Sequence, residues 1–161
     1  MGSGKSKVAE ALGKILELPV IHTDDLVEKK EGKSISDIFK SSGQEHFREQ
    51  EKNVLHSTLD HNDVIVSTGG GLPCYFDNMD WMNSHGITVY LEANPGLLFH
   101  RLSSAKAGRP LIENLNDVEL MEQISGHLAV RSPYYKKAKL SINAASVNVK
   151  ALAELIMNPN R

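Results

Sequence analysis

The chain has 161 residues, 40% of them hydrophobic and 24% charged, and its formal net charge is −2. This composition suits one ordinary soluble domain with enough apolar material for a core. The charge balance excludes a dedicated nucleic-acid binder, and no apolar run reaches the roughly 20 residues that cross a bilayer. A single cysteine, Cys74, excludes an internal disulfide and a multi-cysteine zinc site. We therefore expect a cytoplasmic protein without nucleic-acid or membrane partners.

The first residues, Gly2-Ser3-Gly4-Lys5-Ser6, form the second half of the phosphate-binding pattern G-x-x-x-x-G-K-[ST]. Apolar residues at helical spacing follow, which predicts a helix over residues 5–16. In this pattern backbone N–H groups bind phosphate oxygens, Lys5 reaches the β- and γ-phosphates, and Ser6 offers its hydroxyl to Mg²⁺. The alternative is a flexible Gly/Ser tag that carries no function.

The first glycine of the pattern and the strand that should precede it are absent from the sequence. We expect the natural start to lie upstream. In doubly wound sheets that strand is central, so its absence leaves each of its two neighbouring strands with one unpaired edge. The backbone N–H and C=O groups along these edges then lack hydrogen-bond partners.

Short apolar runs alternate with helical patterns along the rest of the chain. The expected strands are residues 18–21, 64–66, 87–91 and 140–142, the second of them buried. The further expected helices begin near Asp25, Ser34, Gly43, Pro95, Asp117 and Ser146. This alternation predicts an α/β fold, a three-layer sandwich around a central parallel sheet, in one domain over residues 1–161.

Two polar segments directly follow expected strands, where α/β sheets place their ligands. In His22-Thr23-Asp24-Asp25 a carboxylate could orient a substrate hydroxyl or accept its proton, although Thr23 or Asp24 could instead cap the next helix. In Thr68-Gly69-Gly70-Gly71 three glycines suit a backbone that closely approaches a ligand, with a plain tight turn as the alternative.

Three arginines are candidates for binding anions. Arg48, in Phe47-Arg48-Glu49-x-Glu51, could grip a carboxylate with two N–H groups, or form a solvated helical pair with Glu45 or Glu51. Arg109 and Arg131 each stand close before a proline that fixes the local chain direction; the alternative for both is solvated surface. Cys74 and Trp81 are expected to be packing residues of the core.

In this order, these motifs resemble shikimate kinase. The matching segments are Gly2-Ser3-Gly4-Lys5-Ser6, Leu18-Pro19-Val20-Ile21-x-Thr23-Asp24, Phe47-Arg48-x-x-Glu51, Gly69-Gly70-Gly71, Arg109-Pro110-Leu111 and Arg131-x-Pro133-x-Tyr135. The resemblance covers nearly the whole chain. It implies transfer of phosphate from ATP to the 3-hydroxyl of shikimate, with Mg²⁺, in the pathway toward aromatic amino acids. It also implies a P-loop kinase fold of the nucleoside-monophosphate kinase type, with a five-stranded parallel sheet.

The resemblance assigns roles to residues on the substrate side. Asp24 would hold the reacting hydroxyl and could act as its base. Arg48 and Arg131 would bind the substrate carboxylate, helped by the backbone N–H groups of Gly70 and Gly71. A helical segment over about residues 25–60 would bind the substrate.

On the nucleotide side, the resemblance places Lys5 and the loop from Gly2 to Ser6 on the phosphates. Arg109 would reach the phosphates from a lid over about residues 105–116, and Arg101 would stack on adenine. Lys5, Asp24 and Arg109 are the expected catalytic residues, and the protein is expected to act as a monomer.

One position departs from the family pattern. His22 stands where the family usually has an aspartate that helps position the metal through water, and a neutral imidazole lacks that negative charge. Two alternatives to shikimate kinase therefore stay open. One is another P-loop kinase for a small acid, such as a gluconate kinase, and the other is a non-catalytic nucleotide-binding module.

Overall fold

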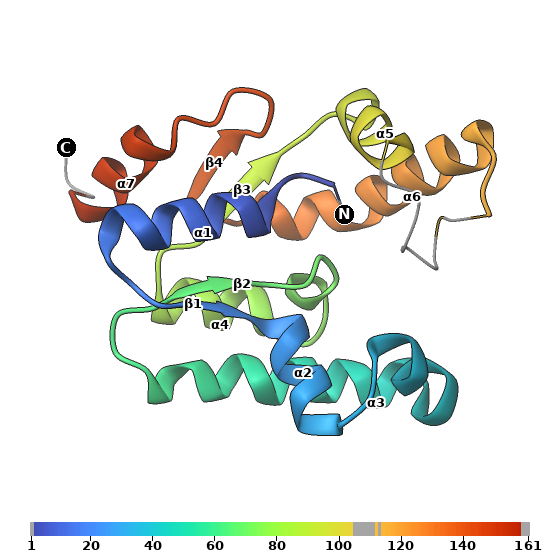
Figure 1. Ribbon diagram of the computed structural model, residues 1–161, viewed down its shortest axis with the longest axis horizontal. Helices are drawn as coiled ribbons and strands as arrows, with labels where there is room; N and C mark the ends of the chain where they lie inside the picture. The colour runs from blue at the N-terminus through green and yellow to red at the C-terminus, as the bar shows by residue number, and fades with distance from the viewer. Residues whose placement is uncertain (1, 105–111, 113, 159–161) are drawn as a thin grey trace.

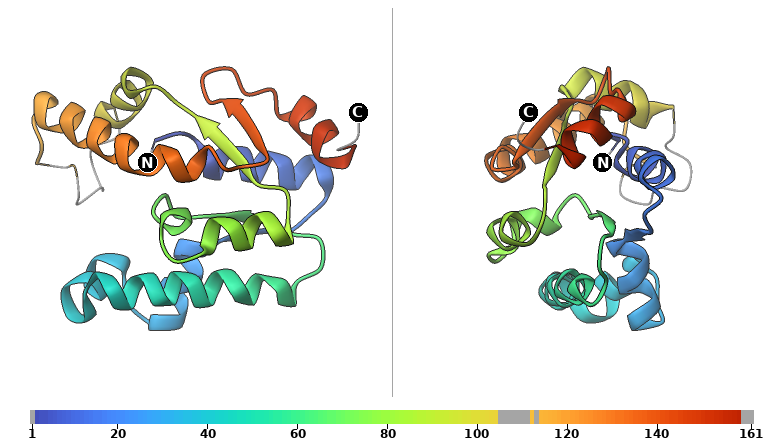
Figure 2. Two further views of the ribbon diagram at one scale, coloured as in Figure 1. Left: turned by 180° about the vertical axis from the view of Figure 1, so that it is seen from behind. Right: turned by 90° about the vertical axis from the view of Figure 1, so that its left-hand side faces the viewer.

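The computed structural model describes residues 2–104, 112 and 114–158. Helices and strands alternate along it, and α1 lies on one side of the strands while α4 and α6 lie on the other (Figure 2). In chain order the elements are α1 (Lys5–Leu16), β1 (Val20–His22), α2 (Thr23–Glu31), α3 (Ile35–Ser57), η1 (Thr58–Asp60), β2 (Ile65–Ser67), η2 (Leu72–Cys74), α4 (Asn78–His85), β3 (Val89–Glu92), α5 (Pro95–Ser103), α6 (Asp117–Tyr135), β4 (Leu140–Asn143) and α7 (Val149–Met157).

The strands are parallel, as predicted, and they form two separate pairs (Figure 1). β1 pairs with β2 in the register Val20↔Ile65, and β3 pairs with β4 in the register Val89↔Leu140. No described strand joins β2 to β3. This arrangement agrees with the expectation that two neighbouring strands are left unpaired.

The prediction of a buried strand at residues 64–66 is wrong. Ile65 and Val66 are half-buried, as are all three residues of β1. Strands of a parallel sheet become fully buried when both faces are covered and both edges are paired. Here each pair has an edge without a described partner strand, which leaves these side chains partly accessible.

The helix starts follow capping chemistry more closely than the apolar pattern alone indicated. The Asn94 side chain accepts the Leu97 N–H at the start of α5, the helix expected to begin near Pro95. For α6 the cap is Asn116 rather than Asp117, because its side chain accepts two backbone N–H groups while Glu119 closes a capping box. For α7 the cap is Asn148, so this helix begins three residues later than predicted.

Two features of the middle of the chain were not predicted. The helices expected from Ser34 and Gly43 form one element, α3, with a kink at Gly43, whose φ of 80° is left-handed.

The second unpredicted feature is the helix α4, which follows the glycine turn. Its Trp81 is not a core residue but is half-buried, with its indole stacked between the imidazoles of His56 and His85 at centroid distances of 4.6 and 4.3 Å.

The apolar core consists of three clusters that follow this arrangement. One lies among β3, β4, α5 and α6, and a second joins α1 to α7. The third packs α2 against α3 through Val27, Ile38, Phe47 and Val54. The α2–α3 layer lies beyond β1 and β2 in Figure 1, away from the other two clusters. Among the described residues, no helix has the length and apolar character that crossing a membrane requires.

Candidate active site

The loop before α1 has the backbone that phosphate binding needs. Gly2 and Gly4 have φ values of 74° and 95°, left-handed conformations that residues with a side chain rarely adopt. The Gly4 carbonyl accepts the Val8 N–H at 3.0 Å, so helical bonding begins at the glycine. Ser6 is exposed in the first turn of α1. The loop thus leads directly into a helix N-terminus, which favours anions.

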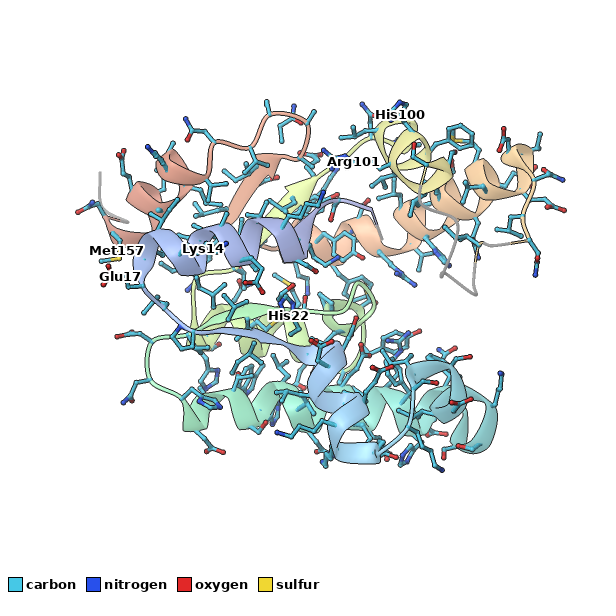
Figure 3. The ribbon with its side chains drawn as sticks, in the orientation of Figure 1. Lys14, Glu17, His22, His100, Arg101 and Met157 are labelled. Atoms are coloured by element: carbon cyan, nitrogen blue, oxygen red, sulfur yellow. The ribbon has the colours of Figure 1, made fainter. Side chains whose placement is uncertain are left out.

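Arg101 of α5 holds this loop in place, and Figure 3 shows its side chain between α5 and the start of α1. Its guanidinium donates to the carbonyls of Gly2 and Ser3 at 3.3 and 2.9 Å, and to the carbonyl of Ala144 at 2.9 Å. Three elements distant in sequence therefore meet at one side chain. Stacking of Arg101 on adenine stays a prediction.

The end of β1 is joined to the glycine turn by a buried hydrogen bond. The Thr23 hydroxyl accepts the Gly69 N–H at 3.0 Å. α2 already begins at Thr23 and has no side-chain cap, so the alternative in which Thr23 or Asp24 caps that helix is wrong. Thr23 instead fixes the distance between β1 and the turn, and Asp24 follows it into the same region.

Asp24 and Lys5 influence each other electrostatically. Burial raises the pKa of Asp24, while the Lys5 ammonium opposes that rise. Burial lowers the pKa of Lys5, Asp24 raises it, and Arg131 lowers it further. A lysine from the start of α1, a carboxylate from the start of α2 and a guanidinium from α6 thus share one poorly solvated space.

The glycine turn is required by the side chains packed against it. A Cβ at Gly69 would lie 2.5 Å from Asp24 Oδ1 and 2.9 Å from Glu51 Oε1, and a Cβ at Gly71 would lie 2.5 Å from a terminal nitrogen of Arg48. Real Cβ contacts are essentially never so short. A plain tight turn does not account for these glycines, because Asp24, Glu51 and Arg48 pack closely against Gly69 and Gly71. That the backbone here also closely approaches a ligand stays a prediction.

Arg48 and Glu51 form a buried ion pair, so the alternative of a solvated helical pair is wrong. The exposed fraction of the side chain is 11% for Arg48 and 2% for Glu51, and the Arg48 guanidinium donates to the Glu51 carboxylate. Burial raises the pKa of Glu51, and the hydrogen bond from Arg48 opposes that rise.

The sequence interpretation included Glu51 only as a motif residue and as a possible solvated partner of Arg48, and did not predict its burial. The available signal was its spacing from Phe47 and Val54, which places it on the buried face of α3. A carboxylate there needs a cationic partner, and Arg48 lies three residues before it.

α6 brings Arg131 and Tyr135 to the region of the glycine turn. The Tyr135 hydroxyl donates to the Gly70 carbonyl. Burial raises the pKa of Tyr135, and Arg131 opposes the rise. Arg131 also acts on the pKa of Lys5 and of Glu51, so its guanidinium lies close enough to both side chains to influence their charge. Cys74, expected to be buried, is half-buried beside this group, and burial raises the pKa of its thiol.

The remaining candidate positions are His22 and Arg109. His22 Nε2 lies 2.8 Å from Glu10 Oε1, an exposed carboxylate of α1 (Figure 3 labels His22). Arg109, and with it most of the expected lid at residues 105–116, lies outside the described residues.

Lys5, Asp24, Arg48 and Arg131 therefore meet around the Gly69 to Gly71 turn, although they come from α1, α2, α3 and α6. The shikimate kinase family model matches residues 1–159 of the chain. The chain belongs to the shikimate kinase family.

Shikimate kinases from several bacteria match most of the chain. The shikimate kinase of Bacteroides fragilis is 43% identical over 138 residues, which are 86% of this chain and 77% of that protein. The crystal structure of shikimate kinase from Bacteroides thetaiotaomicron has a TM-score of 0.92 at 38% identity, over 98% of this chain and 94% of that one. The family, the P-loop kinase fold and the identification as a shikimate kinase are therefore confirmed.

Two further structures bear on the ligand. Shikimate kinase from Acinetobacter baumannii, solved in complex with shikimate, has a TM-score of 0.83 at 28% identity, covering 99% of this chain and 87% of that one. A gluconokinase from Sinorhizobium meliloti has a TM-score of 0.54 at 16% identity, over all of this chain and 93% of that one. The second likeness shows a shared fold alone.

Proposed function

We propose that the protein transfers the γ-phosphate of ATP to the 3-hydroxyl of shikimate, with the residues around the glycine turn as its active site. The observation that carries this proposal is the joint packing of Asp24 and Arg48 against the turn, beside Lys5 of the phosphate loop. Phosphoryl transfer needs positioning and neutralisation of charge more than a covalent nucleophile. A carboxylate for the hydroxyl and cations for the two anionic groups meet that need.

The nucleotide phosphates would lie against the backbone N–H groups of Gly2, Ser3 and Gly4 at the start of α1. Lys5 would bind the β- and γ-phosphates. Its depressed pKa reflects a poorly solvated site in which an ammonium interacts strongly with an incoming phosphate. Arg101 would keep the loop in its binding conformation.

The residues present also suit Mg²⁺. The described residues contain no group of three or more His, Cys, Asp or Glu side chains placed to hold a metal ion. Mg²⁺ needs few protein ligands, since it is usually bound through waters and substrate phosphates. The exposed Ser6 hydroxyl in the first turn of α1 would supply one ligand. When bound, the ion would neutralise charge that develops on the transferred phosphate.

On the substrate side, Arg48 and Arg131 would bind the shikimate carboxylate, with the N–H groups of Gly70 and Gly71 as further donors. Asp24 would accept a hydrogen bond from the 3-hydroxyl and take its proton. Burial raises the pKa of this carboxyl, which makes it a better proton acceptor than an ordinary aspartate.

The proposal keeps several expectations that rest on sequence. The substrate-binding segment would span about residues 25–60, within one domain of residues 1–161. The lid would span about residues 105–116 and carry Arg109 to the phosphates. The lid would also exclude water from the site. The protein would act as a cytoplasmic monomer.

A coupled assay of ADP release tests the proposal against both alternatives. With ATP and Mg²⁺ present, shikimate should stimulate ADP release while gluconate should not. Faster turnover with gluconate than with shikimate would favour a gluconate kinase. ADP release that stays at background with either acid, together with intact ATP binding, would favour the non-catalytic module.

A further inference from the structure

The Arg48 guanidinium has an aromatic partner that the proposed function does not use. The centre of the guanidinium lies 4.3 Å from the centroid of the Tyr75 ring, and 5.1 Å from that of Phe47. Both distances are within the range in which a cation is attracted to the face of an aromatic ring. Tyr75 is the closer partner, and it comes from the segment that follows the glycine turn.

Tyr75 is itself fixed from two sides. Its hydroxyl accepts a hydrogen bond from the Gln44 side-chain amide at 2.8 Å. Gln44 immediately follows the kink of α3 at Gly43. On the backbone side, the Cys74 N–H donates to the Gly71 carbonyl at 2.9 Å. This hydrogen bond fixes the η2 turn, and with it the backbone position of Tyr75, the next residue. The ring therefore ties the glycine turn to α3 across Arg48.

The remaining contacts of the guanidinium show which of its N–H groups have a partner and which do not. One terminal nitrogen donates to Glu51, and the glycine turn packs closely against the terminal nitrogens. The Arg48 Nε is buried, and within the described part of the chain it has no hydrogen-bond partner. A buried donor without a partner is costly and is expected to be satisfied by a ligand or water.

Stacking on a ring differs from a second ion pair in its consequence for binding. A further carboxylate beside Arg48 would orient the guanidinium but would occupy the N–H groups that a substrate carboxylate needs. An aromatic face orients the same group and uses none of its donors, since it attracts the cation through the ring quadrupole.

We propose that Tyr75 is a positioning residue that sets the affinity for the substrate carboxylate by holding the Arg48 guanidinium flat, with its free donors toward the pocket. This inference rests on the proposed function, because it assumes that Arg48 binds the carboxylate of shikimate. Gln44 supports it by fixing the ring through the Tyr75 hydroxyl.

The test compares Tyr75→Leu with Tyr75→Phe by calorimetric titration with shikimate and, separately, with ADP. Tyr75→Leu removes the ring, and shikimate binding should weaken about tenfold. Tyr75→Phe keeps the ring, and binding should stay within about threefold of the wild-type protein. ADP binding should be unchanged in both. In steady-state kinetics KM for shikimate should rise in Tyr75→Leu while kcat changes little.

The neighbouring ring provides a matched control. Phe76 is exposed, and the cation over its ring is the Lys52 ammonium, 5.2 Å from the centroid, whereas Arg48 lies over Phe47 and Tyr75. Phe76→Leu should leave shikimate binding unchanged. In an Arg48→Met background, Tyr75→Leu should add no further loss, because the group that it positions is gone.

The outcomes separate this inference from the function on which it rests. If the wild-type protein binds no shikimate, the proposed function fails. If the wild-type protein binds shikimate and Tyr75→Leu binds it equally well, the positioning role of Tyr75 is wrong. The role is also wrong if Tyr75→Leu weakens ADP binding to the same degree, or if Tyr75→Phe weakens shikimate binding as much as Tyr75→Leu does.

Discussion

At the scale of single residues, the site is defined by charged side chains that lie in contact with backbone lacking a Cβ. Asp24 and Arg48 reach their positions only because Gly69 and Gly71 leave room for them. Glu51 in turn balances the buried charge of Arg48. Each of these contacts can be tested separately from the overall reaction.

Gly69→Ala should displace Asp24 and Glu51, because the added Cβ would lie 2.5 and 2.9 Å from their oxygens. We expect kcat to fall by at least about tenfold, since a small misplacement of a reacting group is costly. Gly126→Ala is the matched control, because nothing lies within 4 Å of a Cβ there. Equal kcat values for Gly69→Ala and the wild-type protein would contradict the role of the turn.

Glu51→Ala should lower the free energy of unfolding by about 3 kcal/mol, because it leaves the Arg48 charge buried and unpaired. Glu10→Ala removes a carboxylate from a more exposed pair, with His22, and should change stability by less than about 1 kcal/mol. Urea titrations of both variants measure the difference. Similar losses for the two variants would mean that the burial of Glu51 has no energetic consequence.

Asp24→Asn should change stability in a pH-dependent way. Burial raises the pKa of Asp24 in the folded protein, so its contribution to stability is present at acid pH and is lost as pH rises through the folded pKa. Asparagine does not titrate. The variant should therefore be more stable than the wild-type protein near pH 7.5, and this advantage should shrink as pH falls through the raised folded pKa of Asp24 and be lost below about pH 4. A difference in Tm that is independent of pH would contradict the raised pKa.

At the scale of elements, the loop that precedes α1 depends on α5 and on the end of β4, through Arg101. The helix boundaries near the site were predictable because they follow from apolar spacing and from glycine, as for α1. The Arg101 contacts were not predictable, since they join residues 99, 98 and 43 positions apart in the sequence. The same holds for Thr23, whose hydroxyl serves the glycine turn and not its own helix.

Arg101→Met should weaken binding of ATP about tenfold or more, since the loop loses two charge-assisted hydrogen bonds and its connection through Arg101 to the Ala144 carbonyl. Tripolyphosphate separates this role from adenine stacking. If Arg101 acts through the loop, tripolyphosphate binding should weaken as well. Calorimetry that shows weaker ATP binding but unchanged tripolyphosphate binding would instead assign Arg101 to the adenine.

His22→Asp should lower the Mg²⁺ concentration needed for half-maximal activity, because it restores a negative charge at the end of β1. Glu10 lies 2.8 Å from His22 and would repel a new carboxylate. The substitution is therefore best made together with Glu10→Gln, with Glu10→Gln alone as the control. An unchanged Mg²⁺ titration in the double variant would show that this position does not influence the metal.

At the scale of the whole molecule, the alternation of strands and helices was sufficient to predict a parallel α/β fold. The order of motifs along the chain then indicated the family. The sequence did not reveal α4, since its apolar pattern is weak, nor the buried Arg48–Glu51 pair, since spacing alone does not tell burial. The half-buried strands follow from the two separate strand pairs, a consequence for burial that the apolar pattern of a single strand does not show.

Hydrogen exchange should report these separate pairs. The Ile65 N–H donates to the Pro19 carbonyl at 2.9 Å, toward the β1 side. Successive residues of a strand direct their backbone groups to opposite edges, so the Val66 N–H points to the edge without a described partner strand. We expect the Val66 amide to exchange at least about tenfold faster than the Ile65 amide. Equal protection of the two would contradict the open edge.

The central claim is that cations and a carboxylate from four helices act on one pair of ligands around the glycine turn. Phosphorus NMR of the wild-type protein with ATP, Mg²⁺ and shikimate tests it most directly. A single new phosphate monoester signal, coupled to one ring proton, should grow in step with ADP, and neither Lys5→Met nor Asp24→Asn should produce it at a comparable rate. Formation of inorganic phosphate alone, or of the ester at the wild-type rate by either variant, would contradict the claim.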